Sequence, residues 1–259
     1  MSLLQPESTM PSIKAKESTL ERVKTGIVGL DNLLQGGIPK YTTVLVSGQP
    51  GSGKTILCYQ FLYEGIKNKE KCLFLTLDKK VDGLLTQAKE LSIDFQPAIE
   101  EGIIKFLFLD INKKLIYETM TNEILSGGYN RIVLDSITPL SEMPIYLDEL
   151  TLKRKDISII NPEEFSPDGN FPIRRLHLHY IMNILENSKA TCIVTSELPL
   201  GSNALSRDGI SEFLADGVIV LTVDTTMDRR KLAVIKMRST KHSLKPQEIE
   251  ILKGGIQFK

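Results

Sequence analysis

Eight consecutive residues have the order of a phosphate-binding loop: Gly48, Gln49, Pro50, Gly51, Ser52, Gly53, Lys54 and Thr55. Gly51 and Gly53 let the backbone turn several N–H groups toward one point. Lys54 can reach the β- and γ-phosphates of a nucleotide, and the Thr55 hydroxyl can ligate Mg²⁺. Ile56 follows in the first turn of an expected helix, whose positive end adds to the attraction for phosphate. The sequence therefore predicts a site for a nucleoside triphosphate and Mg²⁺.

Two carboxylates at the ends of apolar stretches could complete this chemistry. Asp135 ends the stretch 131–135, where a second Mg²⁺-side carboxylate is needed; an ordinary helix cap is the alternative. Asp78 follows the stretch 72–77, where a group must orient and deprotonate the attacking water. The side chain of Asp78 is one methylene shorter than that of Glu. The alternative to a catalytic role is that Asp78 is a solvated charge at the end of a strand. Ser196-Glu197, after the stretch 190–195, could sense the nucleotide.

Two cations late in the chain could also serve a phosphate. Lys236 and Arg238 are two residues apart near the end of an expected strand, so they share one face. Such a pair could contact a γ-phosphate as arginine-finger groups, in cis or from a neighbouring subunit. Charges on an exposed edge strand that discourage aggregation are the alternative.

The elements around these residues predict an α/β fold. Apolar runs alternate with stretches of helical period up to residue 195, and strands then follow one another directly. This order is typical of a mostly parallel sheet with helices on both faces and an antiparallel C-terminal extension. The expected strands are 43–47, 72–77, 103–109, 131–135, 190–195, 218–223, 232–237 and 247–252, and the expected helices 54–67, 81–91, 115–126 and 173–188.

Length and composition set further limits on the chain. It has 259 residues with equal numbers of acidic and basic side chains, 32 each, so no net charge draws it to nucleic acid or membrane. Three scattered cysteines fit reduced core residues and a cytoplasmic location, and no apolar run is long enough for a spanning helix. Residues 1–20 are expected to be a flexible tail and 21–259 a single domain. The proline-rich stretch 138–172 is expected to be irregular and could contact a protein partner or nucleic acid.

Several motifs together resemble the KaiC family of the RecA/RadA superfamily. They occur in the family's order: Thr25–Asp31, Gly36–Pro39, the phosphate-binding loop, Glu212–Val218 and Lys236–His242. The resemblance implies a RecA-like core, ATP as the nucleotide, and a hexameric ring with ATP at the subunit interfaces. It also implies that five late residues reach the nucleotide of the next subunit: Lys236, Met237, Arg238, Thr240 and His242.

Two departures from the family pattern affect the expected activity. The family has paired glutamates after its second strand, where this chain has Asp78-Lys79. We therefore expect slow ATP hydrolysis, or binding with little turnover. The autophosphorylating KaiC domain carries adjacent Ser and Thr where this chain has Ser211-Glu212, so a two-site phosphorylation cycle is not expected.

Three classes of function stay open on sequence alone. The favoured one is an ATP-dependent, oligomeric switch whose nucleotide state is read by partners. The second is a RadA paralogue that binds single-stranded DNA and assists recombination, which requires a basic or aromatic channel. The loop 198–211 offers one cation, Arg207, and no aromatic residue. The third is a phosphotransferase, which Glu212 disfavours in its self-directed form.

Overall fold

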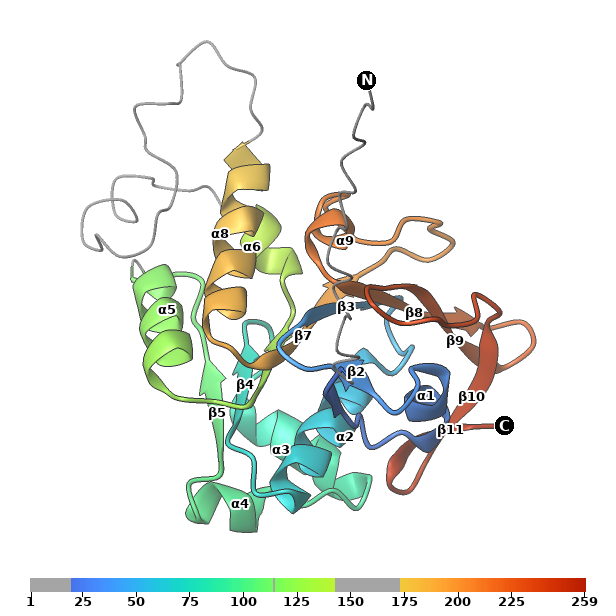
Figure 1. Ribbon diagram of the computed structural model, residues 1–259, viewed down its shortest axis with the longest axis horizontal. Helices are drawn as coiled ribbons and strands as arrows, with labels where there is room; N and C mark the ends of the chain where they lie inside the picture. Colours follow the sequence, from blue (N-terminus) through green and yellow to red (C-terminus); the bar gives the residue numbers. More distant parts are fainter. Residues whose placement is uncertain (1–19, 114, 143–172) are drawn as a thin grey trace, which may run out of the picture.

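The computed structural model describes residues 20–113, 115–142 and 173–259, which are built around a nine-stranded sheet (Figure 1). Across this sheet the strand order is β11-β10-β9-β8-β3-β7-β6-β4-β5, and a small separate sheet pairs β1 with β2. The strands are β1 Arg22–Val23, β2 Ile38–Pro39, β3 Thr43–Gly48, β4 Cys72–Thr76, β5 Ile104–Phe108, β6 Arg131–Asp135, β7 Thr191–Glu197, β8 Gly217–Asp224, β9 Arg229–Met237, β10 Gln247–Leu252 and β11 Gly255–Phe258.

Helices cover both faces of the large sheet (Figure 1). Helices α1 to α4 lie on one face, and α5, α6, α8 and α9 lie on the other. The described helices are α1 Val28–Leu33, α2 Lys54–Lys67, α3 Val81–Glu90, α4 Gln96–Glu100, α5 Ile116–Ser126, α6 Thr138–Glu142, α8 Ile173–Asn187 and α9 Ser211–Leu214.

The central strands are apolar on both sides because each side meets a layer of helices. In β3, Val44 and Val46 join the core under α1 to α4, whereas Leu45 joins the core under α5 and α8. Successive side chains of a strand point to opposite faces, so a continuous apolar run fills both cores at once. This explains why the buried strands show no alternation of polar and apolar residues in the sequence.

The predicted sheet is confirmed in its topology. Strands β8, β3, β7, β6, β4 and β5 pair in parallel, and β9, β10 and β11 add to the β8 edge in antiparallel fashion. Helix α2 has the predicted bounds, 54–67. The three cysteines are free and buried, as expected for core residues. Among the described residues, no helix combines the length and the apolar character that crossing a bilayer would demand.

Some elements differ from the sequence prediction. The expected irregular stretch begins with a helix, α6, and its remainder, 143–172, lies outside the described residues, as do residues 1–19 of the expected tail. Strand β11 was not predicted, although the turn at Gly254-Gly255 between two short apolar stretches is a hairpin signal. Short elements such as α1, α4 and α9 also escaped detection, because they are less than two helical turns long.

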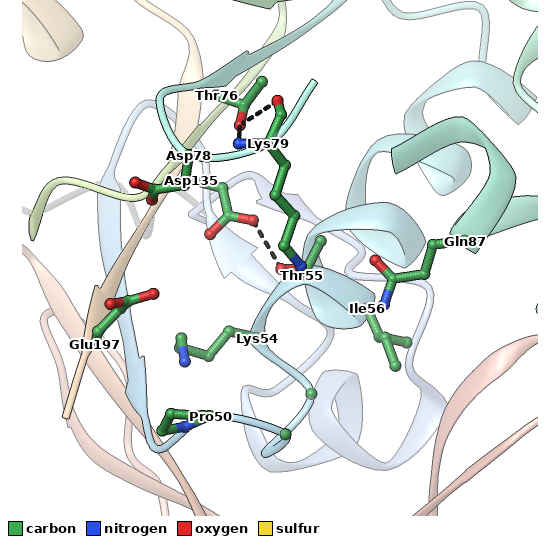
Figure 2. A pocket seen from close by; sticks show the side chains of 12 residues that line it. Pro50, Lys54, Thr55, Ile56, Thr76, Asp78, Lys79, Gln87, Asp135 and Glu197 are labelled. Atoms are coloured by element: carbon green, nitrogen blue, oxygen red, sulfur yellow. Dashed lines mark hydrogen bonds between the residues drawn. The ribbon is translucent and has the colours of Figure 1, made fainter. Parts of the chain in front are cut away.

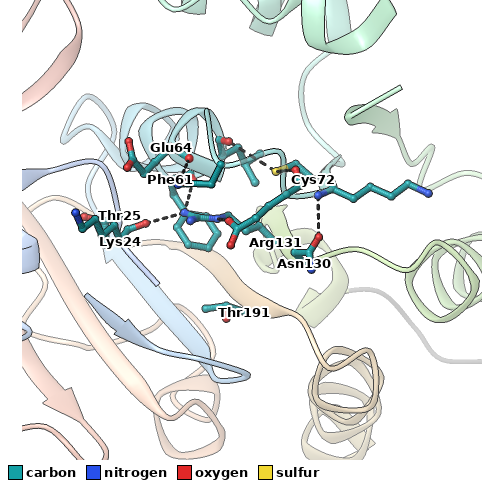
Figure 3. Close-up of polar contacts among 12 residues, drawn as sticks. Lys24, Thr25, Phe61, Glu64, Cys72, Asn130, Arg131 and Thr191 are labelled. Atoms are coloured by element: carbon teal, nitrogen blue, oxygen red, sulfur yellow. Dashed lines mark hydrogen bonds and ion pairs between the residues drawn. The ribbon is translucent and has the colours of Figure 1, made fainter. Parts of the chain in front are cut away.

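A buried arginine next to α2 joins three separate parts of the chain (Figure 3). Arg131, at the start of β6, is only 2% exposed. Its Nη1 donates to the carbonyl oxygens of Lys24 and Phe61, at 2.6 and 2.7 Å, and its Nε pairs with Glu70. The guanidinium carbon also lies 4.8 Å from the centre of the Phe61 ring. The arginine thereby ties the segment around Lys24 to α2 and to the sheet.

Replacing this arginine should destabilise the fold. In Arg131→Ala the two carbonyl groups lose their donor and Glu70 loses its cation, so the free energy of unfolding should fall by about 3 kcal/mol. Chemical denaturation measures this loss. The control is Arg229→Ala, because Arg229 has a side chain 52% exposed and only a 3.9 Å contact with Glu248. That variant should lose about 0.5 kcal/mol at most. Equal losses in the two variants would contradict the structural role of Arg131.

Candidate functional site

The phosphate-binding loop joins β3 to α2 at the carboxyl end of the parallel strands. Gly51 and Gly53 have φ angles of 77° and 106°, a region that side-chain-bearing residues rarely adopt. At Gly48 a Cβ atom would lie 2.5 Å from the carbonyl oxygen of Leu221 in β8, so the loop starts in close contact with its neighbour. Both conditions require glycine. The glycines predicted to bind phosphate therefore have the conformations that this function needs.

Lys54 folds back over its own loop. Its Nζ donates to the carbonyl oxygens of Gly48 and Gln49, at 2.8 and 3.2 Å. Burial lowers the pKa of Lys54, while the carboxylates of Glu197 and Asp135 act to raise it. Charged phosphate oxygens are stronger acceptors than backbone carbonyls, so an anion in the loop can compete for this ammonium group.

Thr55 and Asp135 lie together as the sequence predicts for a Mg²⁺ site (Figure 2). The Thr55 Oγ1 donates to Asp135 Oδ2 at 2.7 Å, and Thr195 in β7 donates to the other carboxylate oxygen. A hydroxyl and a carboxylate are the hard oxygen ligands that Mg²⁺ prefers. In the same loop, the buried Oγ of Ser52 has no hydrogen-bond partner among the described residues. These donors and acceptors fit a phosphate group with its metal ion.

Asp78 also lies in this site, beyond the end of β4. Its Oδ2 accepts a hydrogen bond from Ser136 Oγ at 3.2 Å. Burial raises the pKa of Asp78, and the nearby carboxylates of Glu197 and Asp135 raise it further. A raised pKa makes a carboxylate a better proton acceptor, which agrees with the role proposed from sequence.

These groups line one cavity of about 320 Å³, a size within the range of small-molecule sites. Sequence reasoning did not predict Thr76, Lys79 and Gln87 as site residues, and it suggested Glu197 only as a sensor. The lining is Pro50, Gly51, Gly53, Lys54, Thr55, Ile56, Thr76, Asp78, Lys79, Gln87, Asp135 and Glu197. Glu197 is the last residue of β7, and a polar residue that ends an apolar run is the sequence signal that could have identified it as a site residue. Nothing in the spacing of the residues of α3 identifies Gln87.

Lys236 and Arg238 lie far from the phosphate-binding loop of their own chain. Met237 pairs with Gly217 at the start of β8, and Gly217 pairs with Val44 at the start of β3. The phosphate-binding loop leaves the other end of β3 at Gly48, four residues or roughly 13 Å away along the strand. Lys236 and Arg238 are therefore not part of the cavity of their own chain, which removes the cis alternative.

Lys236 and Arg238 both contact the segment that contains α9. Lys236 Nζ donates to the carbonyl oxygens of Glu212 and Ala215, at 3.1 and 2.6 Å. Arg238 forms an ion pair with Asp216 at 2.8 Å, and its side chain is 59% exposed. Burial lowers the pKa of Lys236, and the charge of Arg238 lowers it further. Both side chains thus contact the same short segment, residues 212–216.

The other late residues differ in what they offer to a neighbour. Met237 is 5% exposed, and the end of its side chain packs against Gly217. Thr240 and His242 lie just beyond β9 on the surface, and Thr240 Oγ1 accepts a hydrogen bond from Arg22 at 2.9 Å. Burial therefore leaves little of Met237 for the contact with another subunit's nucleotide that the resemblance implies.

The fold and the site define an α/β protein with a phosphate-binding loop at the carboxyl edge of a parallel sheet. Residues 23–157 and 163–259 match the family model described as the KaiC ATPase, and the chain belongs to this family. It is 28% identical to a UPF0273 protein of Methanocaldococcus jannaschii, over 92% of this chain and 96% of that protein. It is 29% identical to the circadian clock oscillator protein KaiC of a Picosynechococcus species, over 92% of this chain but 44% of that protein.

A solved structure confirms the fold. The KaiC-like protein PH0186 of the hyperthermophilic archaeon Pyrococcus horikoshii aligns with a TM-score of 0.72 and 32% identity. The alignment covers 93% of this chain and 99% of that one. The predicted family and fold class are thus both confirmed.

The Thr55 hydroxyl should be responsible for the effect of Mg²⁺ on nucleotide binding. Thr55→Ala removes the hydroxyl expected to ligate Mg²⁺. The ratio of ATP affinities with and without Mg²⁺ should therefore fall about tenfold. Thr55→Ser keeps a hydroxyl at the same place and should retain the gain. Calorimetric titration with and without Mg²⁺ measures both variants. The site assignment fails if the alanine variant responds to Mg²⁺ as the serine variant does.

Proposed function

We propose that this chain binds ATP with Mg²⁺, hydrolyses it slowly, and acts as an oligomeric nucleotide-dependent switch. The observation that carries the proposal is the cavity itself, in which Lys54, the Thr55–Asp135 pair and Asp78 converge. The phosphate- and metal-binding groups of one chain come together in this cavity, whereas the hydrolytic position carries a shortened carboxylate. Such a site favours holding a triphosphate over rapid turnover.

Each residue has a distinct role in this proposal. The loop amides and Lys54 bind the β- and γ-phosphates, and Thr55 with Asp135 holds Mg²⁺, which neutralises charge on the phosphates when bound. Asp78 orients the attacking water and accepts its proton. Because its carboxylate extends one methylene less than that of Glu, it holds the water farther from the best position, and positioning strongly affects rate.

The proposed oligomer is a ring, hexameric as the family resemblance implies, with ATP between subunits. Lys236 and Arg238 lie at the amino end of the parallel strands and the loop at the carboxyl end. A head-to-tail ring brings these opposite ends of neighbouring subunits together. The nucleotide of the next subunit would then be contacted by Lys236, Arg238, Thr240 and His242, and to a small extent by Met237. Nucleotide state would be read by a protein partner, with the stretch 138–172 as the proposed contact.

Single-stranded DNA binding, as in a RadA paralogue, is the weaker candidate. Arg207 is the one cation of the loop 198–211, and it pairs with Glu142 of α6 at 3.4 Å. A cation engaged in this way offers less to a phosphate backbone. The three free, buried cysteines support a reducing, cytoplasmic location for the proposed switch.

Slow turnover and its cause can be tested together. The wild-type protein should release phosphate from ATP at less than roughly one per second. Asp78→Glu restores the longer carboxylate and should raise the rate about tenfold, since small displacements of a catalytic group have large effects. Asp82→Glu adds the same methylene at an exposed position outside the cavity and should leave the rate unchanged. A fast wild type, or equal rates in the two variants, would refute the explanation.

A further inference from the structure

A second lysine enters the phosphate cavity from the side opposite Lys54. Lys79 lines the cavity together with Lys54, Thr55 and Asp135. Figure 2 shows its side chain extending from the end of β4 across the cavity toward Thr55, whereas Lys54 comes from the loop below. The binding roles proposed for Lys54, Thr55 and Asp135 do not involve Lys79.

The backbone of Lys79 is fixed by a tight turn after β4. Its N–H donates to Thr76 Oγ1 at 3.3 Å, and Thr76 Oγ1 lies 3.3 Å from the Lys79 carbonyl oxygen. Thr76 is 1% exposed, and α3 begins at Val81, so the turn is anchored on both sides. The next residue, Lys80, is also exposed but does not line the cavity. The turn therefore selects Lys79, and not its neighbour, to enter the site.

The charges of the lining leave Lys79 available to an anion. Three carboxylates, from Asp78, Asp135 and Glu197, share the cavity with the two ammonium groups. No carboxylate oxygen of the described residues lies within 4 Å of the Lys79 ammonium, although it interacts electrostatically with Asp78 and Lys54. A nucleoside triphosphate would add several negative charges to this acidic lining. A second cation reduces the repulsion that results.

We propose that Lys79 binds the terminal phosphate of a bound nucleoside triphosphate from within the same subunit and makes the cavity prefer triphosphate to diphosphate. The inference rests on the proposed function, because it assumes that the nucleotide occupies this loop. Lys54 and Lys79 approach from opposite sides, so the phosphate farthest along the chain lies between them. A diphosphate lacks that phosphate and forgoes the contact with Lys79. The residue that replaces a family glutamate thus becomes a sensor of the nucleotide state.

The test compares affinities for a non-hydrolysable ATP analogue and for ADP, both with Mg²⁺. Lys79→Ala should weaken binding of the analogue about tenfold, the size expected for one charge-assisted hydrogen bond, and change ADP binding less than about twofold. Lys79→Arg keeps the charge and should retain most of the selectivity. Lys80→Ala removes the adjacent lysine outside the cavity and should match the wild type for both ligands.

The outcomes separate this inference from the proposed function. Equal affinities of Lys79→Ala and wild type for the analogue, or equal losses for the analogue and ADP, would overturn the role of Lys79 alone. A wild-type protein that binds neither ligand would overturn the proposed function, and the inference with it. The thermal midpoint of each variant without nucleotide confirms that it is folded. Lys79→Gln, which also removes the charge, replaces the alanine variant if that one does not fold.

Discussion

The parallel pairing of four strands is the constraint on which the site depends. β3 pairs with β7, β7 with β6 and β6 with β4, all in the same direction. Parallel strands present their carboxyl ends at one edge, so residues more than 140 positions apart, from the loop at 48–55 to Glu197, meet there. The hydrogen bond between Thr55 and Asp135 joins the first turn of α2 to the end of β6 across this edge. Without the common strand direction, the phosphate-binding groups and the acidic groups would lie at opposite ends of the strands.

Strand β8 and the antiparallel extension support the same loop from the other side. Arg230 of β9 donates to the carbonyl oxygen of Gly51, and the Val223 N–H of β8 donates to the Gln49 side chain. Deeper in the fold, Gln60 of α2 exchanges two hydrogen bonds with the backbone of Ile256 in β11. The C-terminal strands thus hold both the loop and its helix. They also carry Lys236 and Arg238 to the far end of the sheet, which connects the architecture of one chain to its proposed assembly.

Much of the fold and part of the site could be predicted because their signals are local. The loop motif and the helical period fixed α2 at Lys54–Lys67, and a terminal acid after an apolar run identified Asp135. Gln87 and Lys79 were not predicted as site residues, because their positions depend on how α3 and the turn after Thr76 pack beside the loop. The separation of Lys236 from the loop depends on the register of β8 with β9, and a single sequence does not contain that register.

The central claim is that two neighbouring chains build each nucleotide site, with the loop from one and Lys236 and Arg238 from the other. Mixing two defective chains tests it most directly. Lys54→Ala keeps Lys236 and Arg238 but disables the phosphate-binding loop. Arg238→Ala keeps the loop intact but lacks one of the two cations. Assembled together in equal amounts, they should recover about a quarter of the wild-type ATPase rate, the share of interfaces in a random ring that combine both intact halves. A mixture no more active than the average of its two components would contradict the claim.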